Sequence, residues 1–150
     1  MRPHQHCKVI NVTPPAAIVD NASLTTAEID TLGYRYLSVW AIYGATDIDT
    51  VALKMQSGDV AGTVADVTGL VYGTSNDIAG TLSVIPTATD DNKVYAFEID
   101  LKGRHRYWDL VATLGNGTLG TYCTVIAILW GPESSVNTVA ERGFGGILRV

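Results

Sequence analysis

The chain has 150 residues, of which 47% are hydrophobic and only 17% are charged. This composition excludes an intrinsically disordered chain, and the length predicts one domain whose core needs no disulfide or metal. The net charge of −5, with the few basic residues scattered, argues against a nucleic-acid-binding face. Free soluble domains usually carry more charge, so we expect partners to cover part of the surface.

The cysteines and the apolar segments indicate where the protein is made. Cys7 and Cys123 do not form a disulfide framework, and Cys123 is expected to be a small buried hydrophobe. The N-terminus lacks the apolar segment of a signal peptide, and the longest apolar run, residues 122–130, is too short to span a bilayer as a helix. We therefore expect a soluble protein made in a cytoplasm, without a membrane partner.

The N-terminal part of the sequence predicts an extended arm followed by a strand. Pro14 and Pro15 disfavour both a helix and a central strand, so residues 1–20 are expected to form the arm. In residues 23–31, Glu28 stands at capping-box spacing for a short helix. The threonines and the alternation of apolar with acidic residues favour a strand there instead.

From residue 34 onward, short segments rich in apolar and aromatic residues are separated by turn residues. No internal repeat and no convincing helix lies among them. This pattern predicts an all-β protein, an antiparallel β-sandwich or jelly roll. The expected strands are residues 34–43, 51–56, 63–67, 70–72, 81–85, 95–101, 106–114 and 122–130, with a polar turn at residues 44–49.

Gly115, Gly117 and Gly120 form a GxGxxG motif. Such a motif marks a dinucleotide site when a helix follows it. The residues that follow, 121–128, are rich in β-branched and aromatic side chains, which favour a strand, so no helix N-terminus faces a phosphate. We interpret the motif as a hairpin turn between core strands and expect no cofactor. The strand at residues 122–130 is apolar on both faces, which predicts a central strand covered on both sides.

The C-terminal segment differs from the rest of the chain. Residues 135–142 could hold one helical turn, and the glycines around Phe144 are too permissive for regular structure. The sequence then ends on an apolar segment that contains Ile147 and Leu148. An apolar, glycine-hinged terminus usually docks onto something, and a neighbouring subunit is a reasonable candidate. The expected organisation is an arm (1–20), a β-sandwich (21–131) and a tail (132–150).

Histidines offer little chemistry. His4, His6 and Cys7 form an H-x-H-C cluster that could hold a soft metal, but no fourth ligand lies near it, and a disordered N-terminus explains it better. His105 lies in a basic turn and is expected to be solvated rather than catalytic. The sequence has no GxSxG, HExxH, P-loop or CxxC motif. We expect no catalytic residues, no metal site and no enzymatic activity.

Two pairs of carboxylates, Asp47 with Asp49 and Asp90 with Asp91, fall in turns. Oxygens in such turns could bind Ca²⁺, but neither stretch has the ligand spacing of an EF-hand loop. Aspartates in turns are explained by hydrogen bonds from the nearby backbone to their own side chains. We therefore interpret both pairs as turn residues.

Two further groups of side chains could form a binding face. Glu98 and Asp100 share one face of one strand, where a polar outer face is favoured over an acid/base pair because no second carboxylate strand accompanies them. A set of aromatic residues could stack on sugars or bases, but their strand parity differs and core packing is the favoured role. These residues are Tyr34, Tyr36, Trp40, Tyr43, Tyr107 and Trp108.

Five stretches carry a resemblance to a known group of proteins. They are PPAAIVDNAS (14–23), IDTLGYRYL (29–37), GATDIDTVALKMQ (44–56), DDNKVYAFEIDLKGRHRYWDLVATLGNGTLGTY (90–122) and ERGFGGILRV (141–150). Through them, most of the chain resembles the capsid decoration or cement proteins that tailed bacteriophages encode beside the major capsid protein. The resemblance implies a β-sandwich or jelly-roll body, symmetric clusters on the capsid exterior, and terminal arms that grip neighbours. It carries over no catalytic residues.

We therefore expect a virion protein on the capsid surface that stabilises the shell by binding the major capsid protein. Binding only the assembled state shifts the equilibrium toward the intact capsid, and terminal arms add avidity across repeated sites. A homo-oligomer is expected, with a trimer as the favoured state. The residues expected to make the contacts lie in the arm and the tail: Pro14, Pro15, Ile18, Phe144, Ile147 and Leu148.

Other functions stay open from the sequence. A head-tail, tail or fibre component with the same fold is a second structural hypothesis. A carbohydrate-binding β-sandwich module is a hypothesis of another class, and it requires an exposed aromatic row involving Trp40, Tyr43 or Trp108. An enzyme ranks last, because no acid, base, nucleophile or metal set converges in the sequence.

Overall fold

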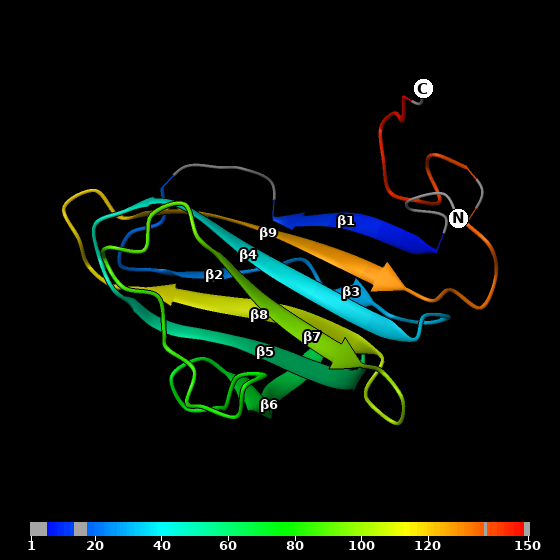
Figure 1. The fold of residues 1–150 in the computed structure, drawn as a ribbon, viewed down its shortest axis with the longest axis horizontal. Helices are drawn as coiled ribbons and strands as arrows, with labels where there is room; N and C mark the ends of the chain where they lie inside the picture. The colour runs from blue at the N-terminus through cyan, green and yellow to red at the C-terminus, as the bar shows by residue number, and fades with distance from the viewer. Residues whose placement is uncertain (1–5, 14–17, 137, 149–150) are drawn as a thin grey trace.

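Two antiparallel β-sheets pack face to face in the computed structural model, which describes residues 6–13, 18–136 and 138–148 (Figure 1). The first sheet has the strand order β1-β9-β4-β7, and the second has the order β2-β8-β5-β6, with β3 also paired to β8. The first sheet comprises β1 (Cys7–Thr13), β9 (Thr121–Trp130), β4 (Tyr36–Thr46) and β7 (Val94–Asp100). The second comprises β2 (Ser23–Thr25), β3 (Ile29–Asp30), β8 (Tyr107–Leu114), β5 (Thr50–Val60) and β6 (Thr63–Val71).

The chain crosses repeatedly between the sheets. β4 leads into β5, β6 into β7, β7 into β8 and β8 into β9, each time from one sheet to the other, whereas β5 and β6 are joined as a hairpin in the second sheet. β2 and β3 pair with the same strand, β8, and act as one interrupted edge strand. This double-sheet path is that of a jelly roll. The prediction of an all-β antiparallel sandwich is therefore confirmed.

The core lies between the two sheets and follows the alternation of the strands. On β4, Leu37, Val39, Ala41 and Tyr43 point inward and are buried, as are the alternate residues of β8 that begin at Trp108. Burying one such large side chain contributes roughly 1.5–3 kcal/mol. The polar ends of the two large aromatics are satisfied, because the Tyr43 hydroxyl lies 3.1 Å from the Thr50 hydroxyl and the Trp108 indole N–H donates to the His105 carbonyl at 2.8 Å.

The prediction that residues 1–20 form an extended arm outside the sandwich is wrong for β1. This strand pairs with β9 from Cys7 to Thr13, and its Cys7 and Val12 side chains are buried. The two prolines do follow the end of the strand, but residues 1–5 and 14–17 lie outside the described residues. β1 is therefore part of the sandwich and forms one edge of the first sheet.

The strand predicted at residues 81–85 is also absent. This segment makes a single bridge, Asn76 to Leu82, and lies in a loop between β6 and β7. The carboxylate of Asp77 organises the loop by accepting hydrogen bonds from the N–H groups of Ala79 and Thr81. Local side-chain hydrogen bonds of this kind compete with strand pairing, which the apolar alternation of the sequence does not reveal.

Smaller differences concern strand limits. β4 continues through Gly44 to Thr46, so the predicted turn at residues 44–49 is shorter than expected. β6 runs without a break through Gly69, whose φ of +94° falls where its pairing with β5 shifts register. Such a shift is typical of a β-bulge, where glycine adopts the left-handed backbone at no steric cost.

β9 is central, as predicted, but its outer face is only partly covered, because Ile128 is buried there while both ends of the strand are exposed. Its inward residues Val125, Ala127 and Leu129 are buried, whereas Tyr122 and Trp130 on the outer face remain exposed. The outer face of the first sheet therefore presents apolar side chains to solvent. No helix among the described residues is long and apolar enough to cross a membrane.

Candidate functional site

The GxGxxG loop joins β8 of the second sheet to β9 of the first. It is thus a crossover between sheets, and the predicted hairpin turn is wrong because the two flanking strands do not pair with each other. As expected, a strand and not a helix follows the motif. The loop nevertheless presents a row of backbone N–H groups, the feature by which glycine loops bind anions.

These N–H groups bind a carboxylate of the chain itself. Asp47 accepts hydrogen bonds from the N–H groups of Thr118 (2.9 Å), Leu119 (2.7 Å) and Gly120 (2.8 Å). The bonds from Leu119 and Gly120 hold the pKa of the Asp47 carboxyl below its ordinary value. A Cβ on Gly117 would lie 2.4 Å from the Asp47 carboxylate, so this glycine is required by the close approach. The loop is an internal anion site, already filled.

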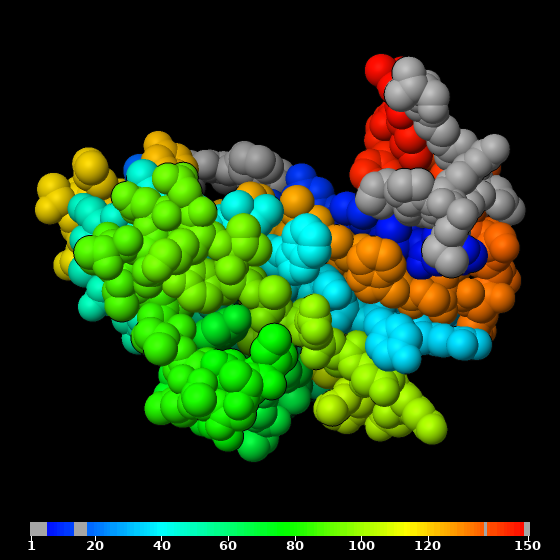
Figure 2. Space-filling model, in the orientation of Figure 1, coloured from blue at the N-terminus to red at the C-terminus, as the bar shows by residue number. Residues whose placement is uncertain are grey.

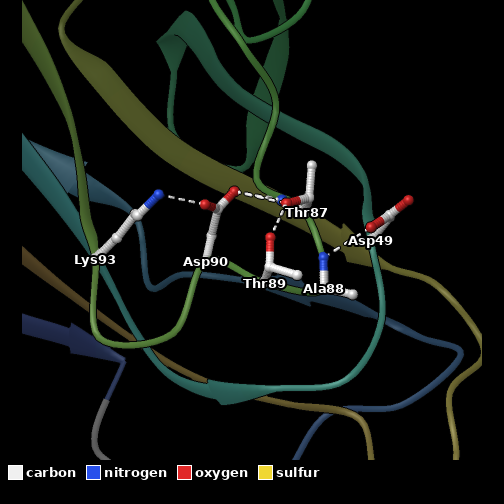
Figure 3. Close-up of polar contacts among 6 residues, drawn as sticks. All are labelled: Asp49, Thr87, Ala88, Thr89, Asp90 and Lys93. Carbon is white, nitrogen blue, oxygen red and sulfur yellow. Dashed lines mark hydrogen bonds and ion pairs between the residues drawn. The ribbon is translucent and has the colours of Figure 1, made fainter.

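A second carboxylate network ties the β6–β7 connection to the β4–β5 turn (Figure 3). Asp90 accepts hydrogen bonds from the N–H and hydroxyl of Thr87 and forms an ion pair with Lys93, while Asp49 accepts from the N–H of Ala88 at 2.7 Å. The Lys93 ammonium, followed by the Thr87 N–H, holds the pKa of the Asp90 carboxyl well below its ordinary value.

Asp91, the fourth of the turn aspartates, accepts a hydrogen bond from the N–H of Thr46 at 2.8 Å. All four turn carboxylates accept backbone hydrogen bonds, but only Asp90 accepts from its own turn, as the turn interpretation predicts. The donors to Asp47, Asp49 and Asp91 lie far away in the sequence, so the prediction of local hydrogen bonds is wrong for these three. No group of three or more potential metal ligands occurs among the described residues.

His105 lies beside a serine and an aspartate. Its Nδ1 atom is 2.9 Å from the Ser57 hydroxyl, and its Nε2 atom is 3.9 Å from an Asp59 carboxylate oxygen. In a hydrolytic triad, Nε2 faces the serine and Nδ1 faces the carboxylate, so the roles of the two ring nitrogens are reversed here. Ser57 is also buried while Asp59 is largely exposed. The contacts of His105 therefore hold its loop in place rather than position Ser57 as a nucleophile.

The aromatic residues divide between the core and the surface. Tyr43 and Trp108 are fully buried, which excludes them from any exposed row. Tyr36 and Trp40 lie on the outer face of β4, with 51% and 39% of their surface exposed, so the core role favoured for them is wrong. Trp130 of β9, opposite Tyr36, joins them with 38% exposed. Sequence reasoning missed Trp130, because only the register of β4 and β9 brings it to this face.

The exposed aromatics line a hollow on the first sheet. Figure 2 shows side chains of β4 and β9, in cyan and orange, on the face that the sheet turns to the viewer. The hollow has a volume of about 500 Å³. Besides Tyr36, Trp40 and Trp130, its lining includes Ser38 and the two carboxylates of Glu98 and Asp100. We refer to this feature, between β9, β4 and β7, as the aromatic groove.

The C-terminal tail is anchored on the free edge of β1. The carbonyl of Arg142 accepts a hydrogen bond from the N–H of Val9 at 2.9 Å, and the buried Arg142 side chain donates to the carbonyl of Val136 at 3.0 Å. Cys7 of β1 is fully buried beside this part of the tail, and burial raises the pKa of its thiol. The tail thus covers an edge strand that would otherwise expose unpaired backbone groups.

One helical turn precedes the end of the tail, in a segment where the sequence could hold one. Thr138 and Glu141 cap each other reciprocally, since each backbone N–H donates to the other's side chain, and the N–H of Arg142 donates to the carbonyl of Thr138. Gly143 ends the turn with a φ of +79°, a common role for glycine at a helix C-terminus.

The residues expected to make contacts have different environments. Pro14 and Pro15 lie outside the described residues. Ile18 is half-buried and lies against the GxGxxG loop, next to the bridge from Val19 to Thr121. Beyond the anchored turn, Phe144 and Ile147 are half-buried and Leu148 is fully exposed. In Figure 1 this last part of the tail, drawn in red, extends away from the sandwich.

Comparisons with known proteins add one structural similarity. No family model and no curated protein matches the chain. Among solved structures, it is similar to the SPBc2 prophage-derived protein YomS, with a TM-score of 0.47 and 16% sequence identity over 82% of this chain and 91% of that chain. At this level the similarity carries no argument about function.

Proposed function

We propose that the protein is a structural component of a tailed-phage virion, which decorates the capsid exterior by binding the major capsid protein. The five stretches that resemble capsid decoration proteins support this class of virion protein. A jelly roll is a compact body that recurs in viral capsid proteins. The acidic charge of the chain suits a position outside the shell, away from packaged DNA.

The observation that carries the proposal is the architecture of the tail. Its base is fixed to β1 through Val9 and Arg142, whereas its end presents a fully exposed Leu148. A fixed base lowers the entropy that the end loses on binding, and the apolar end supplies surface to bury against a neighbour. The tail is therefore suited to reach from one anchored body to an adjacent subunit.

The same tail suits a homo-oligomer, with a trimer as the expected state. Identical tails can exchange contacts around a symmetry axis, and repeated sites on a shell make weak contacts add up. Analytical ultracentrifugation of the purified protein gives the mass of the assembly. A monomer at micromolar concentration would contradict this part of the proposal.

Deleting residues 144–150 tests the proposal. The truncated protein retains the anchor at Arg142 and is expected to keep its far-UV circular dichroism and thermal unfolding. Its occupancy on particles assembled from the cognate major capsid protein should fall at least tenfold in a co-sedimentation assay.

Leu82→Ser provides the matched control, because Leu82 is an exposed apolar residue in the β6–β7 loop rather than in the tail. This variant should bind particles as the wild type does. Unchanged occupancy of the truncated protein, or an equal loss in the control, would contradict the proposed role of the tail.

A further inference from the structure

The aromatic groove combines two kinds of side chain that the sheet register brings together. Tyr36 lies opposite Trp130 on β9 and opposite Asp100 on β7. Two residues further along β4, Ser38 lies opposite Glu98, and Trp40 follows after another two. Paired residues of antiparallel strands share a face, so rings and carboxylates line one continuous strip of the outer surface.

The rings in the strip are available to a ligand. Tyr36, Trp40 and Trp130 keep 51%, 39% and 38% of their surface exposed, and none belongs to the buried core cluster between the sheets. Large exposed apolar side chains gathered in a hollow are typical of binding sites rather than of side chains that only stabilise the fold.

The carboxylates in the strip are available as hydrogen-bond acceptors. The side chain of Glu98 forms no hydrogen bond or ion pair with the residues that the structure describes, and Asp100 uses one side-chain oxygen to accept from the N–H of Lys102 at 3.0 Å. Among the described residues, no lysine or arginine forms a salt bridge with either carboxylate. The groove therefore offers negative charge and open acceptors beside apolar rings.

This combination selects among ligand classes. A phosphate or other anion is opposed by two carboxylates, and a wholly apolar ligand would desolvate them without providing a donor. A small quaternary cation needs rings that converge on one point. Here Tyr36 and Trp130 lie opposite each other, but Trp40 is four residues further along β4, about 13 Å from Tyr36 between Cα atoms, so the three rings do not converge on one point.

We propose that the aromatic groove binds an uncharged oligosaccharide. A pyranose with equatorial hydroxyls has a flat C–H face that packs on an aromatic ring, while hydroxyls at its rim donate to carboxylates. The spacing of Tyr36 and Trp40 exceeds one sugar ring, so the groove takes a chain of sugars rather than a monosaccharide. The inference does not depend on capsid binding, which the tail is proposed to provide.

Calorimetric titration of the full chain with cellohexaose, chitohexaose and maltohexaose tests the inference. At least one of these probes should bind with a Kd below about 1 mM. Trp40→Ala and Trp130→Ala should each weaken binding at least tenfold. Far-UV circular dichroism should show that both variants stay folded at the temperature of the titration, so that the loss of binding is local.

Tyr122→Ala is the matched control. Tyr122 is an exposed aromatic of β9 on the same outer face but does not line the groove, so this variant should bind as the wild type does. Intrinsic fluorescence gives a second readout: Trp108 is buried, so a change on binding reports on Trp40 and Trp130.

Glu98→Gln separates the proposed ligand from a cationic one. The glutamine carbonyl still accepts a hydrogen bond from a sugar hydroxyl, so sugar binding should weaken only a few-fold. The proposal is overturned if none of the three probes binds, if Tyr122→Ala is as damaging as Trp40→Ala, or if an oligolysine peptide binds instead and Glu98→Gln abolishes that binding.

Discussion

The Asp47 carboxylate occupies the GxGxxG loop, where its Oδ2 atom accepts a hydrogen bond from the N–H of Leu119 at 2.7 Å. The loop thus uses the same backbone groups that would cradle a phosphate, but it uses them to fix the turn after β4 against the start of β9. A nucleotide would have to displace this carboxylate. We accordingly expect no nucleotide binding at this loop.

The first prediction concerns Asp47→Ala. Removing the carboxylate leaves the N–H groups of Thr118, Leu119 and Gly120 without their acceptor, so their amide hydrogen exchange should accelerate at least tenfold. Asp49→Ala is the control, because Asp49 accepts from Ala88 instead. Equal exchange in wild type and Asp47→Ala would show that the carboxylate does not hold the loop.

The second prediction concerns the pH dependence of stability through Asp109. This residue of β8 is buried, its Oδ1 atom has no hydrogen-bond partner among the described residues, and burial together with Glu28 raises the pKa of its carboxyl above 3.8. The folded protein therefore holds this proton to a higher pH than the unfolded chain does. The contribution of Asp109 to stability is complete below pH 3.8 and is lost as the pH rises through the folded-state pKa.

Asp109→Asn should consequently raise the Tm by a few degrees at pH 7, and the gain should shrink as the pH falls toward 4. Differential scanning calorimetry at several pH values measures both effects. Glu98→Gln, which neutralises an exposed carboxylate on the other sheet, should give no such gain. A lower Tm for Asp109→Asn at pH 7 would contradict the assignment.

The third prediction concerns Gly143 and the thiol of Cys7. A Cβ at position 143 would lie 1.7 Å from the carbonyl oxygen of Val9, and the φ of +79° adds strain. Gly143→Ala should lift the tail from β1 and expose Cys7, so that its reaction with a thiol reagent accelerates at least tenfold in a Cys123→Ala background.

Gly145→Ala is the control for this experiment, because a Cβ there meets nothing within 4 Å. Its Cys7 should react as slowly as in the parent protein. A Cys7 that remains unreactive in Gly143→Ala would show that the tail does not cover it.

Much of the fold could be predicted from the sequence because strand alternation reports which side of a sheet is buried. Leu37, Val39 and Ala41 alternate with polar or larger residues, and the structure buries them as a set. The same alternation wrongly predicted a strand at residues 81–85, because the side chain of Asp77 satisfies backbone groups that strand pairing would otherwise use.

Less of the candidate site could be predicted from the sequence. Tyr36 and Trp130 are far apart in the chain, and only the register of β4 with β9 places them opposite each other. The role of Asp47 depends likewise on a crossover that no local pattern specifies. The sequence also does not show that β1 is an edge strand. Only in an edge strand is the N–H of Val9 left unpaired by a neighbouring strand, so the anchoring of the tail on β1 could not be predicted.

A cryo-EM map of the virion that contains the protein tests the proposed decoration of the capsid. We expect density for the jelly roll on the outside of the shell, with the C-terminal tail in contact with a neighbouring subunit. Density confined to the head-tail connector, the tail or the fibres, or absent from the particle, would contradict it.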